Sequence, residues 1–442
     1  MTLFQKIVSV LSFGSLQILA SKFIGLIQFA VLVRLLSTSE IGIIGLAGGY
    51  VAILSFILVS PESILIRDFK KIQPKLNVYV SSFLQFLIYR NILIFAGGSL
   101  VAWYVLPLPD NPALTAYFIL LLLYHLITSL SGPLREAFYG YYRQARITIV
   151  DLMVSIMLIA TMPILYFSRD VVVYGMLQVL VASLGVGWWY WNARRYLNFL
   201  FVGGLNFRKW NIKLSLDTIR QFGVWNHLSW MVIRLVYQVD IVLLGFFVSL
   251  EALGSYAVAL TIANVFLVFP LMLQKILSLS LSQIEDKIVL QNIFGVTVRY
   301  NTIFSLAQFL GFIFLGGFII SIFGPDNPGV VWLYSLYIIA GITLFNVVRP
   351  WTSLAFIHLS PREYFLGLYA VPAICSVPIY FLAAQYGGAL GVAKANVLTF
   401  GLIALWVVLY VRYRVRLSPN LKFISTSEKS FAEKMVRYFY RQ

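Results

Sequence analysis

Two basic residues near the middle of long, mostly apolar segments are the strongest candidates for chemistry in this sequence. Lys22 lies in the segment 11–42 and Arg234 lies in the segment 222–248. A charge at the centre of a bilayer costs about 2.5–3.5 kcal/mol on insertion scales, so each cation needs a partner, water or a function. Arginine suits phosphate through two parallel hydrogen bonds, and lysine acts as a point charge. We expect both residues to bind an anionic group; a buried ion pair is the structural alternative.

Polar residues recur at helical spacing beside both cations. Steps of three and four place a stripe on one helix face next to Lys22, formed by Gly14, Gln17, Ser21, Gly25 and Gln28. Steps of four place a second stripe along the other segment, formed by Asn226, Trp230, Arg234 and Gln238. A helix that faces lipid on all sides has no use for such a stripe, whereas a helix that lines a wet cavity does. We predict that Gln28 and Asn226 line a cavity; hydrogen bonding between helices is the alternative for the second stripe.

The apolar segments contain more basic residues than acidic ones. The basic residues are Lys22, Arg90, Arg234, Lys275, Arg299, Arg349 and Lys394, and the acids are Asp151 and Asp240. Pairing cannot neutralise them all, so we expect a net positive interior in which Arg90 and Arg349 also bind substrate. Alternatively, Lys275, Arg299 and Arg349 extend to the cytoplasmic interface. Asp240 either takes a proton or a sodium ion for coupling or pairs with Arg234 or another cation, and Asp151 is expected to be structural.

The composition predicts an all-α, polytopic membrane protein. Of 442 residues, 60% are hydrophobic and only 11% are charged, whereas a soluble domain has about 25% charged residues. At about 20 apolar residues per span, the length accommodates about twelve transmembrane helices. The net charge of +17 follows from basic cytoplasmic loops, because the loops expected outside hold only Arg34 and Arg169 as basic residues. We therefore expect a multi-pass protein with both termini in the cytoplasm.

The second half of the chain repeats features of the first. Phe13-Gly14 and Phe222-Gly223 open corresponding spans, and Glu40-Ile-Gly42 and Glu251-Ala-Leu-Gly254 enter the spans that follow. This pattern predicts a parallel repeat about an axis normal to the membrane. We expect a six-helix lobe over 1–197, a cytoplasmic linker over 198–221, a second six-helix lobe over 222–412 and a basic cytoplasmic tail over 413–442. The tail either forms a helix on the membrane surface or is disordered.

The sequence lacks the motifs of catalysis and of cofactor binding. His125, His227 and His358 are scattered without metal-ligand spacing. There is no P-loop, no dinucleotide fingerprint and no HExxH pair. We expect a protein that is not an enzyme, has no catalytic residue, cofactor or metal, and binds no nucleic acid.

Four short stretches resemble one family in order and in position. They are RLLSTSEIG at 34–42, DIVLLG at 240–245, LGSYA at 253–257 and YGGALGVA at 386–393. They resemble the bacterial oligosaccharide flippases of the Wzx type, within the multidrug/oligosaccharidyl-lipid/polysaccharide exporter superfamily. The resemblance extends over essentially the whole chain and implies two six-helix lobes around a central cavity. Because related flippases carry cations in that cavity, Lys22 and Arg234 are the residues to which the resemblance assigns this role.

The same resemblance implies a function. Such a flippase moves polyprenyl-pyrophosphate-linked oligosaccharide repeat units from the inner to the outer leaflet of the bacterial inner membrane, for O-antigen or exopolysaccharide assembly. Its partners would be membrane lipids, a polysaccharide polymerase and the chain-length machinery. The alternatives are a cation-coupled multidrug exporter of the same fold and a membrane-embedded polysaccharide polymerase or glycosyltransferase. An exporter of cationic drugs would favour an acidic cavity, and a polymerase would favour a large outer loop with catalytic residues.

Overall fold

The computed structural model describes residues 20–54, 61–62, 64–67, 69–104, 111–141, 143–197, 212–220, 224–268, 270–271, 274, 287–417 and 419. Over these residues every regular element is helical, which confirms the all-α fold. Residues 20–35 form the first described helix. Of the basic tail expected over 413–442, residues 418 and 420–442 lie outside the described residues.

The elements follow one another along the chain in two groups. The first group contains α2 (Thr38–Leu54), α3 (Ile64–Arg67), α4 (Phe69–Ile72), η2 (Gln73–Lys75), α5 (Leu76–Tyr104), α6 (Pro112–Ser129), α7 (Gly132–Gly140), α8 (Gln144–Ala160), α9 (Met162–Ser168), α10 (Val171–Tyr196) and α11 (Ile212–Thr218). The second contains α12 (Val224–Leu244), α13 (Leu250–Val265), α15 (Lys287–Phe323), α16 (Pro328–His358), α17 (Pro361–Glu363), the π-helix η5 (Tyr364–Ala370) and α18 (Val371–Val415).

The chain is a multi-pass membrane protein. Seven helical segments among the described residues are long and apolar enough to cross a membrane. The helices α2 and α13 are also apolar but shorter within the described residues.

Glycine and proline set the breaks between several spans. A Gly132-Pro133 pair begins α7 directly after α6, and Pro163 lies in the first turn of α9 after α8 ends at Ala160. The elements η5 and α18 follow one another without a loop, and Gly388 interrupts the α18 helix with φ of 53°. Glycine tolerates this backbone conformation because it has no Cβ.

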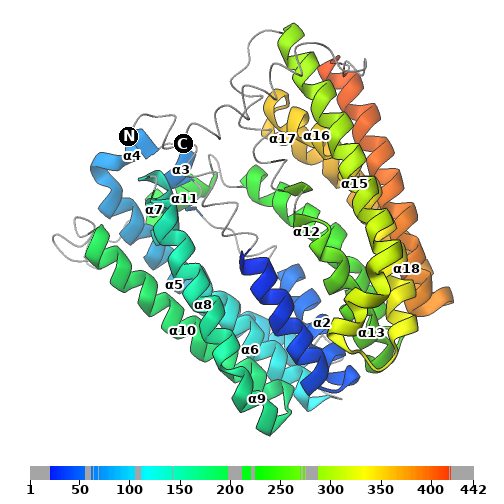
Figure 1. Cartoon of the computed structure of the whole chain (residues 1–442). Helices are drawn as coiled ribbons and strands as arrows, with labels where there is room; N and C mark the ends of the chain where they lie inside the picture. The colour runs from blue at the N-terminus through cyan, green and yellow to red at the C-terminus, as the bar shows by residue number, and fades with distance from the viewer. Residues whose placement is uncertain are drawn as a thin grey trace, which may run out of the picture.

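The two groups of helices form two arms that diverge from a common end (Figure 1). Helix 20–35 and α2 to α11 form the first arm, and α12 to α18 form the second. The arms meet where α2 packs on α13 and α12, which we call the junction. The other end, where α3, α7, α11 and α17 lie in Figure 1, is the open end.

Buried apolar side chains reflect the same division. One core cluster runs through the junction and joins residues of both arms, such as Leu46 and Tyr117 of the first and Tyr256 and Ile338 of the second. A separate cluster lies at the open end of the first arm and contains Phe83, Phe138 and Trp189. The arms therefore share one apolar core at the junction and do not share the cluster at the open end.

Candidate functional site

The first arm encloses a polar cavity of about 700 Å³. Its walls come from helix 20–35, from the segment after α2, and from α6, α7, α8 and α10. Basic and acidic side chains both line the cavity. The charged lining residues among those described are Lys22, Glu62, Arg135, Glu136 and Asp151. A volume of this size falls in the range of sites that bind small organic ligands, about 300–1,000 Å³.

The break between α6 and α7 places Arg135 and Glu136 in the cavity wall. Arg135 forms an ion pair with Asp151 of α8, and its guanidinium carbon lies 5.8 Å from the ring centroid of Trp189 on α10. The ion pair joins α7 to α8, which agrees with the structural role expected for Asp151. Arg135 was not among the candidate residues expected from the sequence, because it falls outside the predicted apolar spans.

Glu62 lies against the same break. A Cβ added to Gly132 would lie 2.8 Å from the Glu62 Oε1 atom, so a larger residue here would displace the Glu62 carboxyl group. Glu62 Oε2 is buried and accepts no hydrogen bond from a described residue. Burial raises the pKa of the Glu62 carboxyl above its ordinary value, and the nearby charge of Arg90 offsets only part of this shift. Neither Glu62 nor Glu136 was nominated from the sequence, because both fall outside the apolar segments.

Among the nominated cations whose side chains are described, Lys22 is the one that lines this cavity. It lies in the first described turn of helix 20–35, and its side chain is exposed. Within the described part of the chain, no hydrogen bond or ion pair joins its ammonium group to another residue. The geometry therefore leaves its charge available to a ligand.

Arg90 lies behind the cavity wall. It donates to Asn91 Oδ1 at 2.9 Å and to Ser129 Oγ at 3.1 Å, and Ser129 lines the cavity. Gln28 instead joins two helices of the first arm, because its Nε2 donates to the Tyr174 hydroxyl at 2.7 Å. Gln28 does not appear among the residues that line the cavity.

Arg349 belongs to the second arm and is far from this cavity in the fold. Its side chain is buried and donates to Asn346 Oδ1 at 2.7 Å, to Gln274 Oε1 at 3.0 Å and to the Tyr237 hydroxyl at 3.0 Å. The guanidinium also lies over the Phe345 ring. The alternative in which Arg349 extends to the interface is therefore wrong, because the guanidinium is held inside the helix bundle by neutral groups.

Asp240 lies in a second buried network of that arm. Its Oδ1 accepts from its neighbour Ile241 N at 2.8 Å, and its Oδ2 accepts from the Tyr256 hydroxyl at 2.5 Å. Asn396 Nδ2 in turn donates to the Tyr256 oxygen at 2.9 Å, and Tyr380 donates to Asn396 Oδ1 at 3.0 Å. These partners, all from the described part of α12, α13 and α18, are neutral.

The remaining nominations fall on α12. Asn226 and Arg234 lie on this helix, but their side chains are outside the described residues. Their expected roles stay predictions.

The junction closes one end of the molecule through tight contacts between the arms. A Cβ on Gly42 would overlap the Leu250 carbonyl group, and a Cβ on Gly254 would overlap that of Thr38. Thr38 Oγ1 also donates to Asp326 in front of α16. Arg34 Nη2 donates to the Ile322 carbonyl oxygen at 2.8 Å, in the last turn of α15. The glycine contacts bring α2 and α13 close together, and the hydrogen bonds of Thr38 and Arg34 connect the first arm to the end of α15 and the turn before α16.

Comparison by sequence finds no relative. No protein-family model matches the chain. No curated protein matches it.

Comparison by structure finds membrane transporters over nearly the full length. An inward-facing multidrug resistance MATE family transporter of the MOP superfamily aligns with a TM-score of 0.66 at 14% identity, covering 90% of this chain and 94% of that one. The lipid II flippase MurJ in an inward closed conformation aligns with a TM-score of 0.66 at 13% identity, covering 92% and 87%. A MOP superfamily transporter from Pyrococcus furiosus, described as having a binding pocket of reversed polarity, aligns with a TM-score of 0.58 at 16% identity. The alignment covers 93% of this chain and 95% of that one. The chain therefore has the fold of the MOP superfamily transporters.

Proposed function

We propose that this protein is a flippase for polyprenyl-pyrophosphate-linked oligosaccharide repeat units. It would move them from the inner to the outer leaflet of the bacterial inner membrane by alternating access. The observation that carries the proposal is the cavity of the first arm, where the exposed Lys22 ammonium meets a space large enough for part of a polar headgroup. A pyrophosphate cannot cross hydrocarbon without groups that replace its water.

The arrangement of the arms supports a transport cycle. The junction lies at the end that carries Arg34 and Arg169, which the distribution of basic residues places outside. The open end carries the basic residues at 194–195 and 412–416 and would face the cytoplasm. A headgroup would enter from the cytoplasm while the lipid tail stays in the bilayer. Separation of α2 from α13 would then release it outside.

The lobes, the linker and the tail proposed from the sequence fit this cycle. The first lobe (1–197) and the second (222–412) would move against each other, with the linker at 198–221 between them. In this linker, α11 packs on α5, where Ser215 Oγ donates to the Ser82 carbonyl oxygen at 3.2 Å. Membrane lipids and a polysaccharide polymerase with its chain-length machinery remain the proposed partners.

A deletion strain tests the flippase proposal. Loss of the gene should cause intact lipid-linked repeat units to accumulate on the cytoplasmic leaflet of the source bacterium. A polymerase would instead leave single repeat units on the outer leaflet. Restoring the wild-type gene should clear the accumulated units, and a Lys22→Ala gene should clear them poorly.

A cation-coupled multidrug exporter of the same fold is the second candidate. It is favoured by the carboxyl groups of Glu62, Glu136 and Asp151 in the cavity wall, since a cationic drug prefers acidic surroundings. Efflux of a cationic dye from cells that express the protein, without any change in lipid-linked units, would support the exporter.

A further inference from the structure

A second cavity, of about 520 Å³, lies between the two arms at the junction, and we call it the outer pocket. Residues 37–39 of the first arm form one wall, and the first turns of α13 and α16 form the others. Its acidic lining residues are Glu251 and Asp326, and no basic residue among those described lines it. Both acids lie at helix starts, where the positive ends of the helix dipoles offset part of their charge.

Ser255 brings the outer pocket close to a buried carboxylate. The residue is only 7% exposed, lines the pocket and makes no hydrogen bond with another described residue. Its hydroxyl is therefore available to water or to an ion in the pocket. The next residue along α13 is Tyr256, whose hydroxyl donates to Asp240.

A short series of contacts connects the outer pocket to Asp240. Tyr334 lines the pocket, and its ring centroid lies 6.2 Å from that of Tyr256. The Tyr256 hydroxyl donates to Asp240 and accepts from Asn396 at 2.9 Å. Because Tyr256 is fully buried, its side chain separates the pocket from the carboxylate.

Asp240 lies much closer to the junction than to the open end. Four residues separate it from the end of α12 at Leu244, and sixteen separate it from the start at Val224. At a rise of 1.5 Å per residue, these spacings correspond to about 6 Å and about 24 Å. The short way to water is therefore the one that leads to the junction.

An aromatic layer lies on the other side of Asp240, toward the open end. The rings of Tyr237, Phe345 and Phe400 pack against one another with centroids 5.3–6.1 Å apart. The space beside them is about 10 Å³, which is at the lower limit for a single water. An ion is strongly disfavoured among such rings, so this side is closed to it.

Three basic residues of neighbouring segments are directed away from the series of contacts. Arg34 donates to carbonyl oxygens in the last turn of α15. The Lys394 ammonium is exposed and lies 5.8 Å from the ring centroid of Tyr337. Arg349 donates to the hydroxyl of Tyr237, which belongs to the aromatic layer. None of the three lines the outer pocket.

We propose that the outer pocket is the entrance through which a proton or a small cation from the outer solution reaches Asp240. The Ser255 hydroxyl and the carboxylates of Glu251 and Asp326 form the entrance, and Tyr256 is the barrier between the entrance and Asp240. This inference rests on the orientation given under the proposed function and deepens that function. It adds the side from which a coupling ion enters and an entrance separate from the cavity of the first arm.

The accessibility of a cysteine at position 240 to Ag⁺ tests the entrance. Asp240→Cys is made in a Cys375→Ser background, and right-side-out and inverted membrane vesicles are treated with silver nitrate in a chloride-free buffer. The remaining thiol is then counted with a fluorescent maleimide after denaturation. Ser168→Cys and Asp217→Cys are reference sites, because both residues are exposed and lie at the junction end and the open end.

We expect Asp240→Cys to react from the same side as Ser168→Cys. The rate from that side should exceed the rate from the side of Asp217→Cys by about tenfold or more, because a bare cation is strongly disfavoured in the aromatic layer.

A substitution in the pocket wall then assigns the reaction to this entrance. Val330 lines the pocket and is exposed, so Val330→Trp should obstruct it. We expect the reaction at Asp240→Cys to slow about tenfold, because Ag⁺ must pass an indole packed into the opening. Val371→Trp is the matched control, since Val371 is also exposed in the second arm but does not line the pocket. It should leave the rate unchanged.

Charge variants provide a second measurement that is independent of the obstruction. Glu251→Gln and Asp326→Asn should each slow the reaction of Ag⁺ at Asp240→Cys about two- to fivefold, because acidic groups raise the local concentration of cations. Asp217→Asn is the control and should have no effect, since Asp217 is at the open end.

The outcomes separate this inference from the proposed function. Reaction of Asp240→Cys only from the side of Asp217→Cys, reaction from neither side, or a rate that Val330→Trp leaves unchanged would overturn the entrance. The silver reaction needs no lipid-linked substrate, so each of these results would leave the flippase standing. Reaction of Ser168→Cys from inverted vesicles would instead overturn the orientation on which both rest.

Discussion

Gly42 and Gly254 make reciprocal contacts across the junction. Gly42 packs on the carbonyl group of Leu250, and Gly254 packs on that of Thr38. Leu250 precedes Gly254 by four residues, and Thr38 precedes Gly42 by four. The two contacts are therefore equivalent under exchange of the two halves of the chain. The repeat inferred from Glu40-Ile-Gly42 and Glu251-Ala-Leu-Gly254 thus corresponds to a physical contact between the same two segments.

Alanine at either glycine should open the junction. The added Cβ would overlap backbone atoms, and an overpacked contact typically costs about 1–3 kcal/mol. In a Cys375→Ser background, Gly42→Ala and Gly254→Ala should raise outside labelling of Ser255→Cys by a membrane-impermeant maleimide about tenfold. Ser255 is buried beside the junction and is a suitable reporter.

Gly48→Ala is the control for this prediction. Gly48 lies on α2, as Gly42 does, and a Cβ added to Gly48 would meet no atom within 4 Å. Labelling that stays the same in all three variants would show that the glycine contacts do not limit opening of the junction.

Arg34→Gln should open the junction less strongly than the two glycine substitutions do. The Arg34 guanidinium caps the last turn of α15 by donating to the carbonyl oxygens of Ser321 and Ile322. A cation at a helix C-terminus stabilises it by about 0.3–1 kcal/mol when exposed. The same labelling assay should show a rise of less than about fivefold, and Arg169→Gln should show none. A decrease in labelling for Arg34→Gln would contradict a closing role for this residue.

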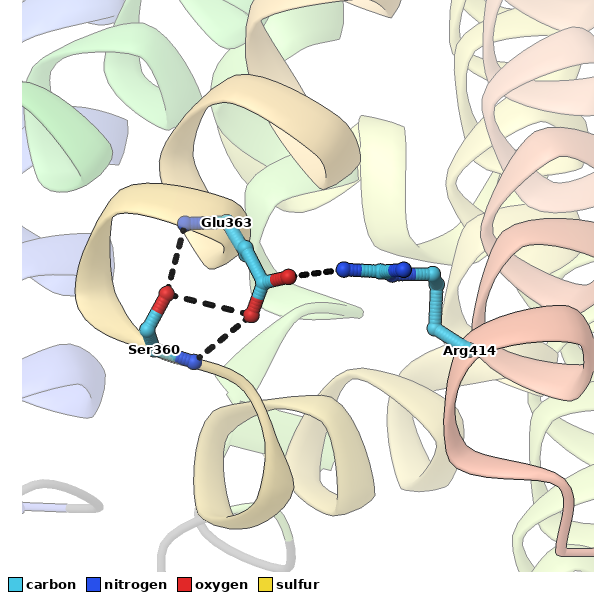
Figure 2. Close-up of polar contacts among 3 residues, drawn as sticks. All are labelled: Ser360, Glu363 and Arg414. Atoms are coloured by element: carbon cyan, nitrogen blue, oxygen red, sulfur yellow. Dashed lines mark hydrogen bonds and ion pairs between the residues drawn. The ribbon is translucent and has the colours of Figure 1, made fainter.

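Acid should weaken the attachment of α17 to α18. Glu363 accepts from Ser360 N at 3.3 Å and from Ser360 Oγ at 3.1 Å, and it forms an ion pair with Arg414 (Figure 2). The pKa of Glu363 lies below its ordinary value of 4.5. The larger cause is the hydrogen bond from the Ser360 backbone N–H, and the next is the hydrogen bond from Arg414. The folded state therefore binds this proton less readily than the unfolded state. The stabilising contribution is complete above the ordinary value and is lost as the pH falls through the lowered pKa.

Glu363→Gln measures this contribution directly. Thermal unfolding in detergent should show a lower melting temperature for the variant at pH 7. The difference from wild type should shrink as the pH is lowered below 4.5. A difference that is constant over the same pH range would mean that the charge of Glu363 is not the stabilising feature.

Asp240→Asn should uncouple transport from an ion gradient. Asp240 is buried, and it accepts hydrogen bonds from two neutral groups among the described residues, Ile241 N and the Tyr256 hydroxyl. The Tyr256 oxygen in turn accepts from Asn396, which is also neutral. A buried carboxylate is costly unless a cation or a proton neutralises it, so a coupling ion would stabilise this group. Stimulation of flipping by an imposed proton or sodium gradient should disappear in Asp240→Asn while movement without a gradient persists. Tyr256→Phe, which removes only the hydroxyl donor, should keep part of the stimulation; full stimulation in Asp240→Asn would argue against coupling here.

The sequence predicts the fold well because span length, hydropathy and charge distribution are local properties. The breaks at Gly132-Pro133 and Gly388 follow from residues that do not continue a helix. The π-helix η5 was not predicted, since its extra residue per turn depends on packing. Nothing in the sequence of Tyr364–Ala370 distinguishes it from an ordinary apolar helix.

The candidate site was predictable only in part. Lys22 was found because a charge inside an apolar segment is conspicuous. Glu62, Arg135 and Glu136 were missed because they belong to segments that look like ordinary cytoplasmic loops. The fold brings them to the cavity through the turn at Gly132, which is a tertiary event. The described residues that line this cavity carry charges of both signs, and the net positive interior stays a prediction.

Flipping in proteoliposomes tests the central claim most directly. A polyprenyl-pyrophosphate disaccharide with a neutral glycan is loaded, and its appearance outside is followed for wild type, Lys22→Ala, Lys22→Arg and Arg234→Ala. We predict movement by wild type, a loss of about tenfold or more in Lys22→Ala, and substantial movement in Lys22→Arg, because the charge at the cavity is retained. No movement by folded wild-type protein, with several glycans and with an imposed membrane potential, would contradict the account.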